Sequence, residues 1–138
     1  MSNFILGMDG KTYHGPSGSK ATEEITNIRD VTLQLEAGEA DVTTRANSGW
    51  RATAATLREA TLEFQMLWKP SDAAFSAIRD AFLNSDEIAL LALDQTDGEG
   101  LDGDFTITSF SRGEPLEEGM TVDVTAKLSN FREWTTPA

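Results

Sequence analysis

The alternation of apolar and polar residues between Thr61 and Trp68 constrains the fold of this chain more than any other feature. The apolar set is Leu62, Phe64, Met66 and Trp68, and the polar set is Thr61, Glu63 and Gln65. A period of two places the two sets on opposite faces of a β-strand. Pro70 then ends the strand, because proline has no N–H to donate to a neighbouring strand. The segment therefore predicts a sheet with one apolar and one polar face.

Other segments repeat this pattern. Further strand candidates lie at residues 27–35, 40–44, 87–94, around 105–107, and at 120–128. In the first of them, Val31, Leu33 and Leu35 share one face of a half-buried strand. The run 87–94 is apolar throughout and too short for a second long helix, so it predicts a buried strand. The turn composition at Gly113–Pro115 predicts that the last two strands form a long hairpin.

One segment has helical periodicity instead. Ser71 is a good N-cap, and Asp72 suits the positive end of the helix dipole. A single apolar stripe follows, formed by Ala74, Phe75, Ile78, Ala81 and Phe82. Asn84 is the expected terminator. The stripe is interpreted as core packing, so this helix is expected to cover one face or end of the sheet.

The predicted fold class is mainly β: a β-sandwich or open barrel of about seven strands with one flanking α-helix. Residues 1–138 are interpreted as one domain, because 39% hydrophobic residues suffice for a single core. Within it, residues 1–26 are expected to form an N-terminal arm or loop, since 7–19 is rich in glycine and serine. Residues 129–138 are expected to form a C-terminal tail.

The charge and the missing residue types exclude several classes of function. The net charge is −12, so the chain would repel DNA over most of its surface. The absence of cysteine excludes disulfides, thiolate metal sites and a cysteine nucleophile. No apolar stretch approaches the roughly 20 residues needed to cross a bilayer, and the first residues do not resemble a signal peptide. The composition suits assembly in a reducing cytoplasm, and no membrane partner is expected.

The sequence offers little that could support catalysis. Its only histidine, His14, lies in the glycine-rich N-terminal segment, and no nucleophile elbow, P-loop or dinucleotide motif is present. A hydrolase using His14 is a remote alternative, and the chain is predicted not to be an enzyme and to need no cofactor. The acidic segment 94–104 offers oxygen ligands for Ca²⁺, but its spacing does not match an EF-hand. A solvated loop without metal is preferred.

The tryptophans indicate an interaction role. Trp68 belongs to an apolar strand face, whereas Trp50 sits beside Arg51 in a turn-rich segment and Trp134 lies near the C-terminus. Aromatic residues beside arginines are common in protein interfaces. For Trp50, interface and core packing remain equally open. These residues alone therefore indicate an acidic, strand-rich assembly or binding domain.

A longer stretch carries a family resemblance. The sequence E-A-D-V-T-T-R-A-N-S-G-W at 39–50 and F-S-R-G-E-P-L-E-E at 110–118 resemble the tail tube (major tail) proteins of long-tailed bacteriophages. The resemblance extends over about residues 27–130 and includes F-Q-M-L-W, the predicted helix and I-A-L-L-A-L-D. It implies a β-sandwich with one helix, in rings of six copies whose inner sheets join into a continuous barrel and which stack into a hollow tube.

The same resemblance implies roles for particular residues. The stretch Glu39–Arg51 would be an extended loop or hairpin that reaches a neighbouring ring. The expected inter-subunit residues are Glu39, Asp41, Thr44, Arg45, Asn47, Trp50 and Arg51. Either of two polar strand faces would line the lumen, namely Thr61, Glu63 and Gln65, or Thr121, Asp123 and Thr125. Carboxylates and hydroxyls there would repel phosphates and let DNA pass without binding.

The implied partners are other copies of the chain, a tape-measure protein, a tail terminator, and distal tail or baseplate proteins, all within the virion tail. Tube proteins of related injection machines share this fold, so a contractile tail, a gene transfer agent and a type VI secretion tube stay as alternatives. A third alternative, from another class, is a Ca²⁺- or carbohydrate-binding β-sandwich that uses the acidic loop.

Overall fold

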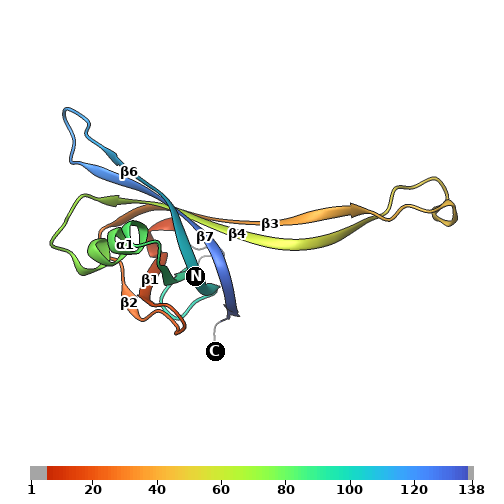
Figure 1. Cartoon of the computed structure of the whole chain (residues 1–138), viewed down its shortest axis with the longest axis horizontal. Helices are drawn as coiled ribbons and strands as arrows, with labels where there is room; N and C mark the ends of the chain where they lie inside the picture. Colours follow the sequence, from red (N-terminus) through yellow and green to blue (C-terminus); the bar gives the residue numbers. More distant parts are fainter. Residues whose placement is uncertain (1–5, 137–138) are drawn as a thin grey trace.

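Seven strands form one antiparallel sheet in a computed structural model that describes residues 6–136 (Figure 1). In chain order the elements are a 3-10 turn η1 (Gly7–Asp9), β1 (Lys11–Pro16), β2 (Glu23–Glu24), β3 (Ile28–Asp41), a 3-10 turn η2 (Arg45–Asn47), β4 (Thr53–Leu67), α1 (Ala73–Leu83), β5 (Glu87–Leu93), β6 (Gly100–Gly113) and β7 (Thr121–Thr135). The strand order across the sheet is β2-β1-β5-β6-β7-β4-β3. The predicted fold class, mainly β with seven strands and one helix, is confirmed.

The sheet curves back on itself, as an open barrel does. Its two edge strands are β2, which ends at Glu24, and β3, which begins at Ile28.

 The connection between them therefore consists of residues 25–27 alone, which brings the two edges of the sheet close together. Hydrogen bonds fix this connection at both ends: the Ile25 N–H donates to the Thr12 carbonyl (2.8 Å), and the Leu67 N–H donates to the Asn27 carbonyl (3.0 Å). Register shifts in the β3–β4 and β6–β7 pairs mark β-bulges, which let long strands bend.

The core lies between the concave face of this sheet and α1. Phe75 and Ile78 of the helix are fully buried against strand residues such as Leu62, Met66 and Val122. The apolar sets predicted for the strands at 61–68, 105–107 and 120–128 do face this core. The predicted buried strand at 87–94 is β5, which pairs with both β1 and β6. Hydrophobic alternation therefore identified most of the core. In β3 it did not: only Leu33 of the predicted half-buried set packs against the core, whereas Val31 is 42% and Leu35 53% exposed.

The helix begins one residue later than predicted. Asp72, not Ser71, is the N-cap, because its Oδ2 accepts a hydrogen bond from the Phe75 N–H (3.2 Å). Asn84 is the C-cap, as expected. Phe82 lies at the border of the apolar stripe, where it is 37% exposed and stacks on Phe110 at 6.1 Å between ring centroids.

Several elements have other bounds than those predicted, because the strands of the sheet extend further along the chain. Residues 40–44 are not a separate strand, because β3 continues to Asp41. The acidic loop is shorter than expected, since β6 begins at Gly100. Residues 129–135, expected as a tail, continue β7, and the N-terminal 26 residues contain β1 and β2. In each case pairing with a neighbouring strand overrides an unfavourable local composition. No helix within residues 6–136 is long and apolar enough to span a membrane.

Candidate assembly surfaces

The two polar strand faces proposed for the lumen form one continuous surface. β4 and β7 are hydrogen-bonded neighbours, with Glu63 opposite Thr125 and Gln65 opposite Asp123. The Gln65 Nε2 donates to the Asp123 Oδ1 (3.0 Å). Residues directly opposite each other in an antiparallel pair share a face. The structure therefore brings the two alternative sets together, on the side of the sheet away from the core.

This polar surface extends onto the next strand on either side. Thr32 and Gln34 of β3 lie opposite Glu63 and Thr61 of β4. Ser109 and Ser111 of β6 lie opposite Thr125 and Asp123 of β7. Hydroxyls, amides and carboxylates thus dominate one face of the four strands β6-β7-β4-β3. We call these four strands the polar sheet and this face its polar face.

Both sides of the polar sheet end in unpaired strand edges within residues 6–136. Among the described strands, β3 is an edge strand whose only partner is β4. β6 pairs with β5 only through residues 100–106, so its second half, 107–113, pairs with β7 alone. Unpaired N–H and C=O groups along a strand are ready to bind another strand. One copy therefore offers two complementary edges, on opposite sides of the same sheet.

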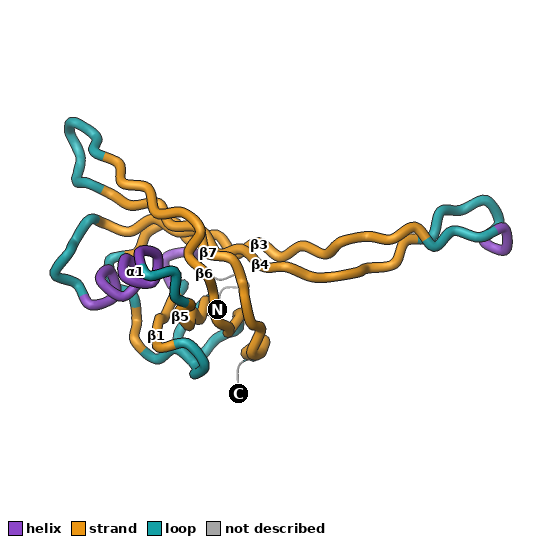
Figure 2. The backbone as a smooth tube through the Cα atoms, viewed as in Figure 1, coloured by secondary structure: helices purple, strands orange, loops and turns teal. Residues whose placement is uncertain are grey.

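The long hairpin of β3 and β4 extends far beyond the rest of the molecule (Figure 1). We call residues 36–58 the arm. The pairing continues to Asp41 opposite Thr53, and a short loop containing η2 closes the end (Figure 2). Few side chains on the arm are covered: Leu57 is 87% exposed and Trp50 is 76% exposed. A hairpin this exposed has no core of its own, which is typical of a segment that packs against another molecule.

The end of the arm, residues 42–52, is held by local hydrogen bonds. The Thr43 Oγ1 accepts from the Ala52 N–H (2.9 Å), and the Asn47 Nδ2 donates to the Trp50 carbonyl (2.8 Å). Ser48 and Gly49 adopt positive φ angles of 52° and 82°, which form the turn. The ends of β3 and β4 are thereby fixed while the larger side chains of the loop point outward. The arm end is a structured surface even without a partner.

All seven residues predicted to contact neighbouring subunits lie on this arm. Glu39 and Asp41 lie near the C-terminal end of β3. Hydrogen bonds from Thr43, first from its side chain and second from its backbone N–H in order of effect, lower the pKa of Asp41. The other five lie in the loop: Thr44, Arg45, Asn47, Trp50 and Arg51. Of the two interpretations left open for Trp50, core packing within the same chain is excluded by its exposure.

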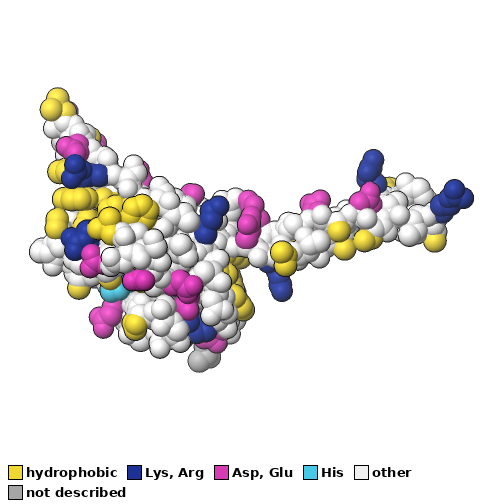
Figure 3. Space-filling view, viewed as in Figure 1, with side chains coloured by type: hydrophobic (Ala, Val, Ile, Leu, Met, Phe, Trp, Pro, Cys, Tyr) yellow, Lys and Arg dark blue, Asp and Glu magenta, His cyan; other side chains and the backbone are white. Residues whose placement is uncertain are grey.

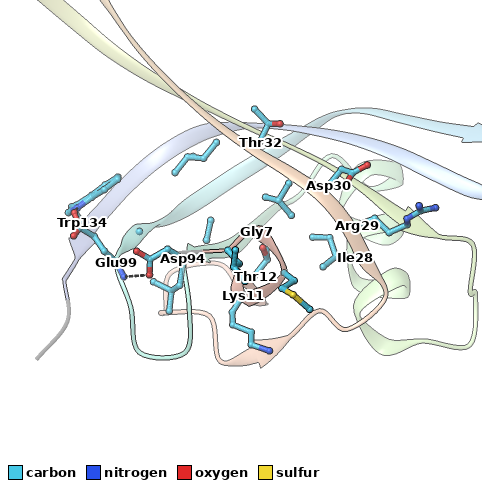
Figure 4. Close-up of a pocket in the computed structure, with 18 residues that line it drawn as sticks. Gly7, Lys11, Thr12, Ile28, Arg29, Asp30, Thr32, Asp94, Glu99 and Trp134 are labelled. Carbon is cyan, nitrogen blue, oxygen red and sulfur yellow. Dashed lines mark hydrogen bonds between the residues drawn. The ribbon is translucent and has the colours of Figure 1, made fainter. Parts of the chain in front are cut away.

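A groove of about 960 Å³ runs beside the unpaired edge of β3 (Figure 4). In Figure 4, Ile28, Arg29 and Thr32 border one side, with Lys11 and Thr12 of β1 across from them. At one end the Trp134 Nε1 donates to the Glu99 carboxylate (2.7 Å). The groove is broad and accompanies a free strand edge, so its geometry suits an extended chain.

A buried ion network, which was not predicted from the sequence, lies between β6 and β7. Arg132 pairs with both Asp102 and Asp104, each at 3.2 Å. The hydrogen bond with Asp102 is the main cause that raises the pKa of Arg132. Desolvation acts in the opposite direction, and the hydrogen bond with Asp104 raises the pKa further. The two carboxylates are almost fully buried, and Asp104 also accepts from the Gly18 N–H (3.0 Å). The network therefore joins the β1–β2 loop to β6 and β7. The one sequence signal for this network would have been an arginine and two aspartates in strands that are predicted to pair.

Part of the acidic segment and the single histidine lie in strands of the sheet. Asp102 and Asp104, expected as exposed loop residues, face Arg132, and the Asp94 Oδ1 accepts from the Glu99 N–H (3.0 Å). Within residues 6–136 no group of three or more acidic or histidine side chains is placed to hold a metal ion. His14 lies in β1 opposite Glu23, and burial lowers its pKa.

A family model and several solved structures are similar to this chain. The family model described as phage tail tube protein matches residues 3–130. A chain in the tail of an empty gene transfer agent particle, obtained with helical refinement and C6 symmetry, is similar with a TM-score of 0.78 and 21% identity, covering 96% of this chain and 98% of that chain. A chain of the SPP1 tail tube has a TM-score of 0.68 and 18% identity, covering 93% and 80% respectively.

A more distant structural similarity is found in the baseplate of the anti-feeding prophage, with a TM-score of 0.57 and 9% identity over 96% of both chains. No curated protein sequence matches significantly. At these identities the structures show a shared fold, and the family match covers most of the sequence. The expected family is thus confirmed: the chain belongs to the phage tail tube protein family and is a structural component of the phage tail, not an enzyme.

Proposed function

We propose that copies of this chain form six-membered rings that stack into the hollow tail tube, which conducts DNA from the capsid to the host cell. The observation that carries this proposal is the polar sheet with its two unpaired edges. Strand 107–113 of one copy pairs with β3 of the next, so both unpaired edges of the polar sheet find a partner once a ring closes. The number six is taken from the C6 symmetry of the similar gene transfer agent tail.

In this arrangement the polar face lines the lumen. The opposite face of the same strands packs on the core and α1, so it is not available to the lumen. Glu63 and Asp123 are exposed on the polar face, where they repel the phosphates of DNA. The neighbouring hydroxyls of Thr61, Thr121 and Thr125 stay hydrated. DNA can then move along the tube without binding to it.

The arm joins successive rings. Its exposed residues, among them Trp50, Arg45 and Arg51, would be covered by a subunit of the adjacent ring. The tape-measure protein inside the tube, a terminator at one end and distal tail or baseplate proteins at the other are the further partners that this function requires. Assembly takes place in the cytoplasm of the host bacterium. The fold match to the gene transfer agent tail supports one second candidate, a gene transfer agent tube, which the DNA content of purified particles would distinguish.

Negative-stain electron microscopy of the purified protein tests the assembly directly. The protein is concentrated at moderate salt, because a net charge of −12 opposes association at low ionic strength. We expect rings or hollow tubes with a pore wide enough for duplex DNA. Particles of monomer size only, even after addition of tail tips that could start stacking, would contradict the proposal.

Charge reversal on the polar face tests its role as the lumen. Glu63→Lys with Asp123→Lys replaces two negative side chains by positive ones on a face that other copies do not cover. We expect tubes to form normally and DNA ejection from phage carrying these changes to slow by about tenfold or more, because lysines bind phosphates. The matched control is Asp80→Lys with Asp86→Lys, outside the polar sheet, which should leave ejection unchanged. Wild-type ejection by the first variant would contradict the assignment of this face.

A further inference from the structure

The chain has two projecting hairpins, and they lie at opposite ends of the polar sheet. The arm continues from the beginning of β4, whereas the β6–β7 hairpin closes beyond Gly113 and Thr121, next to Leu67 at the end of β4. Figure 1 shows the two hairpins pointing away from each other on opposite sides of the molecule. Copies stacked head to tail therefore bring the arm end of one copy toward the β6–β7 end of another.

The two hairpin ends carry opposite charge. The arm end, residues 42–52, contains Arg45 and Arg51 and no acidic residue. The β6–β7 end, residues 113–120, contains Glu114, Glu117 and Glu118 and no basic residue. In Figure 3 a basic side chain marks the far end of the arm, while the tip of the other hairpin shows hydrophobic and acidic side chains, with a basic one farther from the tip. Because the chain has a net charge of −12, the basic arm end favours contact with the acidic surfaces of another copy.

Neither set of charges is fully neutralised within the chain. Glu114 forms a salt bridge with Arg112 of the same hairpin (3.0 Å). The salt bridges found within residues 6–136 include neither Glu117 and Glu118 nor the two arm-end arginines. Opposite charges on two surfaces of identical copies favour a contact between them and disfavour contacts between like surfaces.

Each end also presents a large apolar side chain to solvent. Trp50 is 76% exposed and Leu116 is 100% exposed. Tryptophan and arginine are the residues that most often dominate binding at interfaces. Burying an exposed leucine against an aromatic ring adds a hydrophobic contribution to the charge pairing. The two ends are thus complementary in both respects.

We propose that the arm end of each copy binds the β6–β7 hairpin end of a copy in the adjacent ring, with Arg45 and Arg51 against Glu117 and Glu118, and Trp50 against Leu116. This inference rests on the proposed stacking of rings and specifies the surface that receives the arm. The contact joins two different surfaces of the same chain, so it extends from ring to ring without closing. Because it relies on exposed charges, it weakens as the salt concentration rises.

Charge reversal with rescue tests the pairing. Arg45→Glu with Arg51→Glu, and separately Glu117→Arg with Glu118→Arg, each place like charges against each other, and we expect mean tube length to fall by about tenfold or more. The chain that carries all four substitutions restores opposite charges and should form tubes of nearly wild-type length. Lys20→Glu with Lys69→Glu, an equal charge change on the body, is the control and should not shorten tubes.

Cysteine cross-linking provides an independent readout, because the natural chain has no cysteine. Ala46→Cys in the arm end and Leu116→Cys in the other hairpin should give a disulfide-linked ladder of multimers after oxidation of assembled protein. Ala46→Cys with Ser76→Cys in α1 should give none. Three results would overturn this pairing if the wild type itself forms tubes: full-length tubes from either charge variant, no rescue in the fourfold variant, or no disulfide-linked ladder. None of them would contradict the proposed function. Failure of the wild type to assemble would instead count against the proposed function.

Discussion

Replacing Arg132 with methionine is expected to lower the free energy of unfolding by about 3–5 kcal/mol. The side chains of Asp102 and Asp104 are only 1% and 4% exposed, and Arg132 is the cation that compensates them. Methionine keeps an unbranched apolar stem but is shorter and uncharged, so two buried carboxylates lose their partner. Urea unfolding followed by circular dichroism measures the loss.

Two comparison variants separate this effect from ordinary salt-bridge loss. Lys20→Met breaks the exposed pair with Glu133 (3.9 Å) and should change stability by only about 0–1 kcal/mol. Adding Asp102→Asn and Asp104→Asn to Arg132→Met removes the uncompensated charges and should recover part of the lost stability. A loss below about 1 kcal/mol for Arg132→Met alone would show that the network does not stabilise the fold.

Replacing Phe75 with alanine is expected to lower the free energy of unfolding by about 3–5 kcal/mol. Phe75 is fully buried and meets Trp68 edge to face at 4.9 Å and Phe110 at 5.8 Å between ring centroids. Its removal leaves a cavity between α1 and the sheet that rigid strands cannot close. The same urea unfolding experiment measures the loss.

Phe82→Ala is the matched control for this prediction. Phe82 lies on the same helix but is 37% exposed, so its truncation removes fewer buried contacts and should cost about 1 kcal/mol. The near-ultraviolet circular dichroism should also change in Phe75→Ala, because Trp68 loses its aromatic neighbour. Equal stability losses in the two variants would contradict the central position of Phe75 in the core.

The sequence predicted those strands whose own residues show the pattern. Leu62, Phe64 and Met66 alternate with polar residues because one face of β4 meets the core and the other does not. β1 escaped prediction because its sequence contains Gly15 and Pro16, and it becomes a strand only by pairing with the apolar β5. Local composition does not encode such long-range pairing.

The candidate surfaces were predicted in parts. The arm residues were found through the family resemblance, and the alternation gave both polar sets without showing that β4 and β7 are neighbours. The β6–β7 end was seen only as a turn, because exposure of Leu116 is a property of the folded chain. The contact of Arg132 with Asp102, which are 30 positions apart, likewise depends on strand pairing.

A helical reconstruction of assembled tubes by cryo-electron microscopy tests the central claim most directly. The account predicts a ring of six copies in which strand 107–113 of each copy pairs with β3 of the next and Glu63 and Asp123 face the pore. A tube with the polar face on its outer surface, or rings whose copies touch without pairing these edges, would contradict it.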